Sequence, residues 1–130
     1  MSNGLAISSN PPSSTDLLLE ACPFLREYRN EYWDCGDTIV FGDVARLLQR
    51  GQLAENQALA VFEYFNALAE SGDDRALEVL TTGALETFND DAASQGLART
   101  HLRGKALSLV EEMRVYWGQP DHAGGAKGAG

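Results

Sequence analysis

The chain has 130 residues, 44% of them hydrophobic, and a formal net charge of −9. This length and composition suit one globular domain and exclude a disordered chain. The negative charge argues against direct binding to nucleic acid or to anionic membrane surfaces, because their phosphate groups would be repelled.

The cysteine count and the hydropathy pattern narrow the class further. Cys22 and Cys35 are too few for a disulfide framework, and we expect reduced thiols with Cys22 in the core; a disulfide in an oxidising compartment is the alternative. No apolar run approaches the roughly 18 residues of a membrane span, and the N-terminus does not resemble a secretion signal. We therefore expect a cytoplasmic protein.

The two ends differ in composition from the middle of the chain. Residues 1–14 are rich in Ser, Asn and Pro and are predicted to form a disordered leader. Residues 118–130 are rich in Gly and Ala and are predicted to form a flexible tail. Residues 15–117 then form a single helical domain.

The first predicted helix opens at Thr15 and carries three consecutive leucines. Pro23 interrupts it and suits the first turn of a continuation that reaches Tyr32, because proline needs no amide hydrogen bond there. Residues 34–37 have the composition of a turn.

The second predicted helix is capped by Thr38 and ended by Gly51, and its apolar residues keep the spacing of one helix face. The third is the clearest, because one apolar stripe runs along it until Ser71 and Gly72 stop it. The residues of that stripe are Ala58, Val61, Phe62, Phe65 and Leu68.

The remaining predicted helices complete the fold. Asp73 or Asp74 starts the fourth, and a turn at residues 89–91 leads to a last helical stretch that Gly104 can divide. No segment alternates as a strand would. We predict an all-α fold of five to six amphipathic helices packed as antiparallel hairpins, in a bundle or a short α-solenoid.

Carboxylates crowd residues 55–91, where Arg75 is the only cation and the local net charge is −8. Such a surface suits a basic cleft on a partner protein. A simpler explanation exists for some of these residues, since aspartates at a helix start cap free amides and Tyr64 fits the core edge. The predicted partner-binding residues are Glu63, Tyr64, Asn66, Glu70, Asp73, Asp74 and Glu86.

Other chemistry is weakly represented. Arg99 and Arg103 are helix neighbours suited to pairing with the acidic helix or to a homodimer contact. The histidines and cysteines lack metal-ligand spacing, and His101 is predicted to be a polar interior residue. We therefore predict no metal site, no cofactor and no catalytic residue, and a protein that is not an enzyme.

A resemblance refines this prediction. The segments Cys22-Pro23, Phe41-Gly42-Asp43, Ala58 to Phe62, Ser71-Gly72-Asp73, Leu85-Glu86 and Asn89-Asp90 resemble a bacterial all-helical family of unknown function. Members of that kind occur among the immunity proteins of polymorphic and contact-dependent toxin systems. The resemblance spans roughly residues 17–117 and implies a cytosolic protein that binds and blocks one cognate toxin. It carries over no binding residues.

Two functions from different classes follow. The first is an immunity-type inhibitor whose acidic surface occupies a basic cleft of a cognate toxin. The alternative is a scaffold or adaptor domain that holds a peptide or helix of a partner protein. An enzyme whose pocket the sequence does not reveal is a third option.

Overall fold

The computed structural model describes residues 12–122, with side chains described as far as Arg114. Every regular element in this range is helical, which confirms the all-α prediction. None of these helices is long and apolar enough to cross a membrane. In chain order, with η for a 3₁₀ or π turn, they are α2 Ser14–Ala21, η1 Pro23–Tyr28, η2 Glu31–Cys35, α3 Asp37–Gln49, α4 Glu55–Ala69, α5 Asp74–Val79, η3 Leu80–Ala84, η4 Leu85–Asn89, α6 Ala92–His101 and α7 Gly104–His122.

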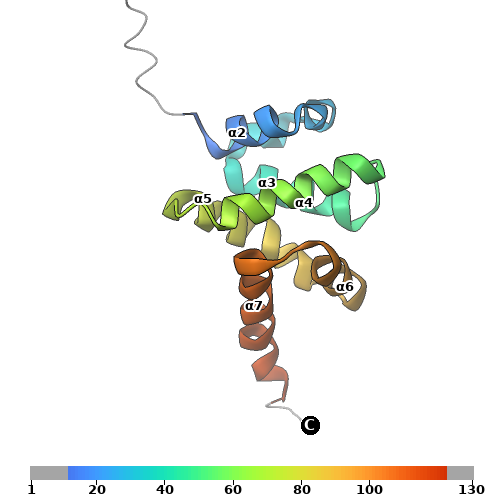
Figure 1. Ribbon diagram of the computed structural model, residues 1–130, viewed down its shortest axis with the longest axis vertical. Helices are drawn as coiled ribbons and strands as arrows, with labels where there is room; N and C mark the ends of the chain where they lie inside the picture. The colour runs from blue at the N-terminus through green and yellow to red at the C-terminus, as the bar shows by residue number, and fades with distance from the viewer. Residues whose placement is uncertain (1–11, 123–130) are drawn as a thin grey trace, which may run out of the picture.

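Helix α3 packs against α2, η2, α5, η3 and η4, whereas α6 and α7 pack against α4 and η4. Figure 1 shows α2 on one side of α3, α4 crossing the middle of the molecule, and α7 running from there toward the C-terminus. Phe41 of α3 stacks on Phe65 of α4, with ring centroids 5.9 Å apart. The ring of Phe62, also on α4, contacts the ring of Phe88 of η4 and that of His101 at the end of α6, with centroid distances of 5.8 and 4.6 Å. His101 is therefore a half-buried stacking residue, as predicted.

The domain begins earlier and its last helix ends later than we predicted. Ser13 caps α2, accepting the amide hydrogen of Asp16 while the Asp16 carboxylate accepts that of Ser13. This reciprocal pair fixes the first turn, so the fold includes residues assigned to the leader. At the other end α7 is helical to His122, past the expected limit at 117. The expected disorder of residues 1–11 and 123–130 lies outside the described residues.

The prediction that the first helix continues from Pro23 to Tyr32 is wrong. Pro23 does sit in a first turn, but the segment forms two separate 3₁₀ turns. Asn30 divides them, because its side chain accepts the amide hydrogen of Tyr32 at 2.8 Å. Side chains of this type compete with the helix for backbone groups. Both cysteines are free. Cys22 is buried, as expected, and burial raises the pKa of its thiol, whereas Cys35 is exposed.

The predicted start of α3 is wrong, and its predicted end is confirmed. Thr38 does not cap the helix, which begins at Asp37 after Gly36, a residue with φ of +145°. Gly51 does end it: φ is +66°, its amide reaches Leu48 at 3.1 Å, and the amide of Gln52 reaches Leu47 at 2.9 Å. Those two bonds satisfy the last carbonyls of the helix, as in the glycine motif predicted here.

The tightest helix contact in the fold joins α3 to η3. A Cβ added to Gly83 would lie 2.8 Å from both Cβ of Phe41 and the backbone oxygen of Thr38. At Gly42 an added Cβ would lie 3.2 Å from the backbone oxygen of Gly83. Only residues without a side chain allow the two backbones to approach this closely. The contact fixes the continuous rod of α5, η3 and η4 against α3. That rod carries three of the nine carboxylates between residues 55 and 91, namely Asp74, Glu78 and Glu86.

Candidate functional site: the acidic segment

The acidic segment consists of the nine carboxylates between residues 55 and 91, and the fold distributes them over five places. Glu55 and Glu63 lie on α4, and Glu70 is its C-terminal cap. The remaining six lie on the turn before α5, on α5, on η4 and on the turn before α6: Asp73, Asp74, Glu78, Glu86, Asp90 and Asp91. Every one of the nine is exposed. They lie on several elements and not on one helix face.

Glu63 is held by the connection between α6 and α7. Arg103 donates from Nη1 and Nη2 to the two carboxylate oxygens of Glu63, at 2.7 and 2.5 Å. These hydrogen bonds from Arg103 lower the pKa of Glu63 and raise that of Arg103. The sequence-based suggestion that Arg103 pairs with the acidic helix is confirmed. Glu63 is therefore neutralised within the molecule.

Asn66 must be removed from the predicted partner-binding residues. Its side chain is only 5% exposed. Oδ1 accepts the backbone amide hydrogen of Arg103 at 3.0 Å, and Nδ2 donates to the backbone oxygen of His101 at 3.2 Å. The side-chain amide of Asn66 thus supplies the hydrogen-bond partners of two backbone groups at the break between α6 and α7. Asn66 does lie in the predicted helix, but its side chain contacts the connection between α6 and α7 and not the solvent.

Glu70 also serves the start of α7. Its Oε2 accepts the amide hydrogen of Lys105 at 2.9 Å, in the first turn, where the helix dipole favours an anion. Gly104, with φ of +56°, lets the chain turn there, and an added Cβ would lie 2.6 Å from the same Oε2. A cleft of about 270 Å³ lies beside these contacts, lined by Glu63, Asn66, Ala67, Glu70, Arg103 and Gly104.

Tyr64 points away from that cleft. It is half-buried and packs against the core edge, which was the simpler of our two explanations. Burial raises the pKa of the Tyr64 hydroxyl, and the nearby ionisable groups of Cys22 and Glu20 raise it further. Tyr64 therefore faces the α2 region, and the structure does not bring it together with Glu63.

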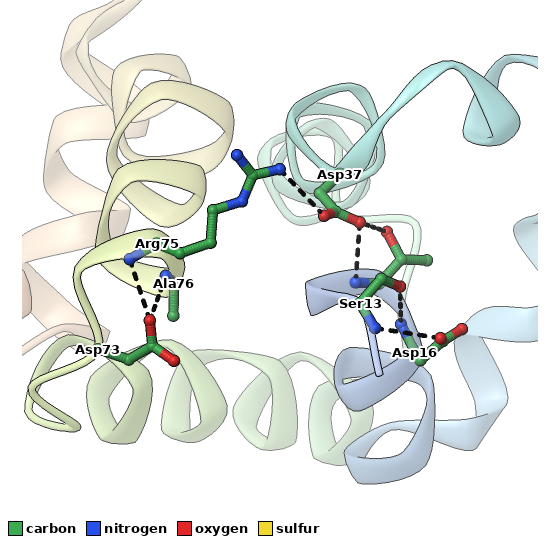
Figure 2. A network of polar contacts seen from close by, with 7 residues as sticks. Ser13, Asp16, Asp37, Asp73, Arg75 and Ala76 are labelled. Carbon is green, nitrogen blue, oxygen red and sulfur yellow. Dashed lines mark hydrogen bonds and ion pairs between the residues drawn. The ribbon is translucent and has the colours of Figure 1, made fainter. Parts of the chain in front are cut away.

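Asp73 and its neighbour Arg75 are part of a group of polar contacts near the start of α5, which Arg75 links to α3 and α2 (Figure 2). Asp73 accepts the amide hydrogens of Arg75 and Ala76 at 3.0 and 3.1 Å, which caps α5 as predicted. The Arg75 guanidinium lies 3.6 Å from Oδ2 of Asp37. Oδ1 of Asp37 accepts the amide and hydroxyl hydrogens of Thr15 at 3.1 and 2.6 Å. Asp37 therefore ties α2, α3 and α5 together.

Asp74 and Glu86 are the two predicted residues that keep an exposed carboxylate without a hydrogen bond or ion pair in the described part of the chain. They lie apart. Asp74 stands one turn before Glu78 on α5, on the same side of the helix. Glu86 stands on η4 at a second cleft, which also includes Arg46 of α3 and Met113 of α7.

Sequence reasoning missed Asp43 as a structural centre. It accepts from Trp33 Nε1 at 2.9 Å, from Asn30 Nδ2 at 3.3 Å and from Arg46 Nη2 at 2.8 Å. Partial burial acts to raise the pKa of Asp43, but the hydrogen bonds from Arg46, Trp33 and Asn30 outweigh it and lower the pKa. A carboxylate three residues before an arginine is a usable sequence signal for the Arg46 contact alone.

The internal ion pairs leave the charge of the acidic segment almost unchanged. Arg103 comes from outside the segment to Glu63, and Arg75 leaves it to meet Asp37. Counting both outside partners gives ten carboxylates against two arginines, a net charge of −8. Helix capping orients Asp73 and Asp91 but does not remove their charge.

Comparison of the chain with protein-family models, with curated proteins and with solved structures found no match. The fold and the acidic segment therefore define its class from this structure alone: an all-α domain with a strongly negative segment between residues 55 and 91.

Proposed function

We propose that this domain is an immunity-type protein that binds a cognate toxin and blocks a basic cleft on it. The observation that carries the proposal is the net charge of −8 on the acidic segment after its internal ion pairs are counted. A concentrated charge of one sign accelerates encounter with a surface of opposite sign and disfavours other partners. The family resemblance supplies the kind of partner.

The surface we assign to this function is smaller than the sequence suggested. Its centre is Asp74 and Glu78 on α5, whose carboxylates make no hydrogen bond or ion pair with the described residues. Asp73, beside them, adds charge while it caps the helix. Glu63 and Glu70 contribute less, because they are committed to Arg103 and to the start of α7.

A scaffold or adaptor domain is the second candidate, and the α4 cleft favours it. That cleft, which Glu63, Glu70 and Arg103 help to line, has groups of both charges, and α4 also exposes the apolar side chain of Leu59. A peptide or helix of a partner protein suits such a groove. Absence of enzymatic activity, a cytoplasmic location and a homodimer remain predictions for either function.

Charge reversal on α5 tests the first proposal. The experiment co-produces the domain with a candidate toxin that carries a basic surface, and it measures growth rescue and association kinetics. Asp74→Lys combined with Glu78→Lys is expected to slow association about tenfold and to weaken rescue, because local attraction becomes repulsion. Wild-type association should also slow with added salt.

The matched control is Glu27→Lys combined with Glu31→Lys. These residues are exposed on η1 and η2, so the net charge changes by the same amount away from the acidic segment. We expect a clearly smaller effect. If both double variants slowed association equally, overall charge and not this surface would govern binding. If neither changed it, the acidic segment would be the wrong surface.

A further inference from the structure

The second cleft, which we call the η4 cleft, combines groups that nothing above has given a role. It measures about 280 Å³ and lies between the end of α3, η4 and α7. That volume is below the usual range for drug-sized ligands, and it suits a single side chain. Its lining residues are Arg46, Glu86, Thr87, Asn89, Asp90 and Met113.

Asn89 is the unusual member of the lining. Its Oδ1 is buried and has no hydrogen-bond partner. Every other buried side-chain oxygen or nitrogen in the described part of the chain has one. Its Nδ2 donates to the backbone oxygen of Val110 at 3.5 Å, the outer limit of a hydrogen bond. A buried acceptor without a donor is unfavourable and rare in folded proteins. This amide is therefore held weakly, and it would gain a hydrogen bond by turning toward a donor that enters the cleft.

The other polar groups of the η4 cleft are mainly acceptors. Glu86 presents an exposed carboxylate, and Asp90 accepts from Gln49 Nε2 at 3.2 Å through one oxygen only. The single cation, Arg46, is already bound to Asp43 at 2.8 Å. The cleft thus carries a net negative charge, with two carboxylates against one arginine. Met113 adds an apolar wall that suits an aliphatic stem.

We propose that the η4 cleft is an anchor site for an arginine side chain of a partner protein. A guanidinium has five N–H donors in a planar fork. Two of them can meet a carboxylate side by side, and a third can reach a neighbouring amide oxygen. Glu86 takes the paired contact, Asn89 turns its oxygen to the third donor, and Met113 covers the stem. This inference rests on the proposed function, because the arginine would belong to the basic partner.

The probe is N-acetyl-arginine amide, titrated into the full chain at constant ionic strength and followed by amide NMR signals. We expect saturable, millimolar binding with shifts confined to the η4 cleft, including the side-chain amide of Asn89. N-acetyl-lysine amide should bind more weakly, because an ammonium lacks the planar fork. The neutral N-acetyl-norleucine amide should not bind.

Two variants separate the site from general attraction. Glu86→Gln is expected to weaken the arginine probe about tenfold, since a charged hydrogen bond is lost. Asn89→Ala should weaken it less, while retained circular dichroism shows the fold to be intact. The matched control Glu78→Gln removes one exposed carboxylate on α5, outside the cleft, and should leave probe binding unchanged.

Three results overturn the inference: no saturable shift, equal binding of the lysine and arginine probes, or equal loss with Glu78→Gln and Glu86→Gln. The proposed function is judged by the α5 charge reversal. Slowed association in that experiment without probe binding here would discard the anchor site and keep the acidic surface.

Discussion

Asn66 illustrates how one polar residue can look like a binding residue and serve the fold instead. It lies one turn after Glu63 on α4, on a face that the sequence marks as polar. The break between α6 and α7 leaves the Arg103 amide and the His101 carbonyl without helix partners, and the Asn66 side chain satisfies both. Buried backbone groups almost always find such partners. Which side chain supplies them depends on contacts more than thirty residues away, and helix spacing does not encode these.

Replacing Asn66 by alanine tests this role. Asn66→Ala leaves one backbone donor and one acceptor unsatisfied in a part-buried place, so we expect a loss of about 2–3 kcal/mol in the free energy of unfolding. Asn56→Ala is the control, because Asn56 is exposed on the same helix, and its effect should stay within about 0.5 kcal/mol. Urea unfolding followed by circular dichroism measures both. Equal effects would show that the Asn66 bonds contribute nothing.

At the level of elements, the sequence predicted best where one residue type decides a boundary. Gly51 and Asp73 ended and started helices as expected, because a left-handed turn and an N-cap each have a strong residue preference. Thr38 failed as a cap because Asp37 is already helical and bonds to Thr15. The 3₁₀ turns after Pro23 were missed, since an apolar pattern specifies which face is buried and not the helix type.

The packing of α3 against η3 predicts opposite effects for two glycine substitutions. Gly83→Ala places a Cβ 2.8 Å from a backbone oxygen and from Phe41, and the backbone cannot move away cheaply. We expect a loss of about 2 kcal/mol or more in the free energy of unfolding. Gly96→Ala lies in α6, where an added Cβ meets nothing within 4 Å, and should gain about 0.5–1 kcal/mol.

Thermal and urea unfolding of both variants measure these changes in the free energy of unfolding. The pair shares the same chemical change, so propensity alone predicts a gain in both. A stabilised Gly83→Ala variant would mean that α3 and η3 separate easily, and that this contact does not fix the rod that carries Asp74, Glu78 and Glu86.

For the whole molecule, the total charge was predictable and its distribution was not. The count of carboxylates gave the −8 of the acidic segment directly. Which of them remain available depends on tertiary contacts, such as Arg103 reaching Glu63 across forty residues. Six arginines are within ion-pair distance of carboxylates in the described part of the chain. The protein therefore presents its excess negative charge on residues that hold no structural partner, notably Asp74, Glu78 and Glu86.

Those contacts also set how stability depends on pH. The pKa is lowered for Asp43, Glu63, Asp91 and Glu111, for Asp91 mainly by the Ser94 amide and for Glu111 mainly by Arg114. A carboxyl whose pKa is lower in the folded state stabilises the fold above its unfolded value, about 3.9 for Asp and 4.3 for Glu. That stabilisation is lost as the pH falls through the folded pKa. Relief of repulsion among crowded carboxylates acts in the opposite direction.

Asp91→Asn separates the two effects in one experiment. Asparagine caps α6 nearly as well as aspartate, but it has no charge to lose on acidification. We expect wild type to lose stability from about pH 5 to pH 2, and the variant to lose less, so that their urea midpoints differ at pH 7 and converge at low pH. The series should be repeated with salt added, which screens the repulsion but leaves the short Ser94–Asp91 hydrogen bond of 2.8 Å in place. A constant difference between the two proteins from pH 7 to pH 2 would show that the Asp91 charge adds nothing to the cap, and that acid unfolding arises elsewhere in the molecule.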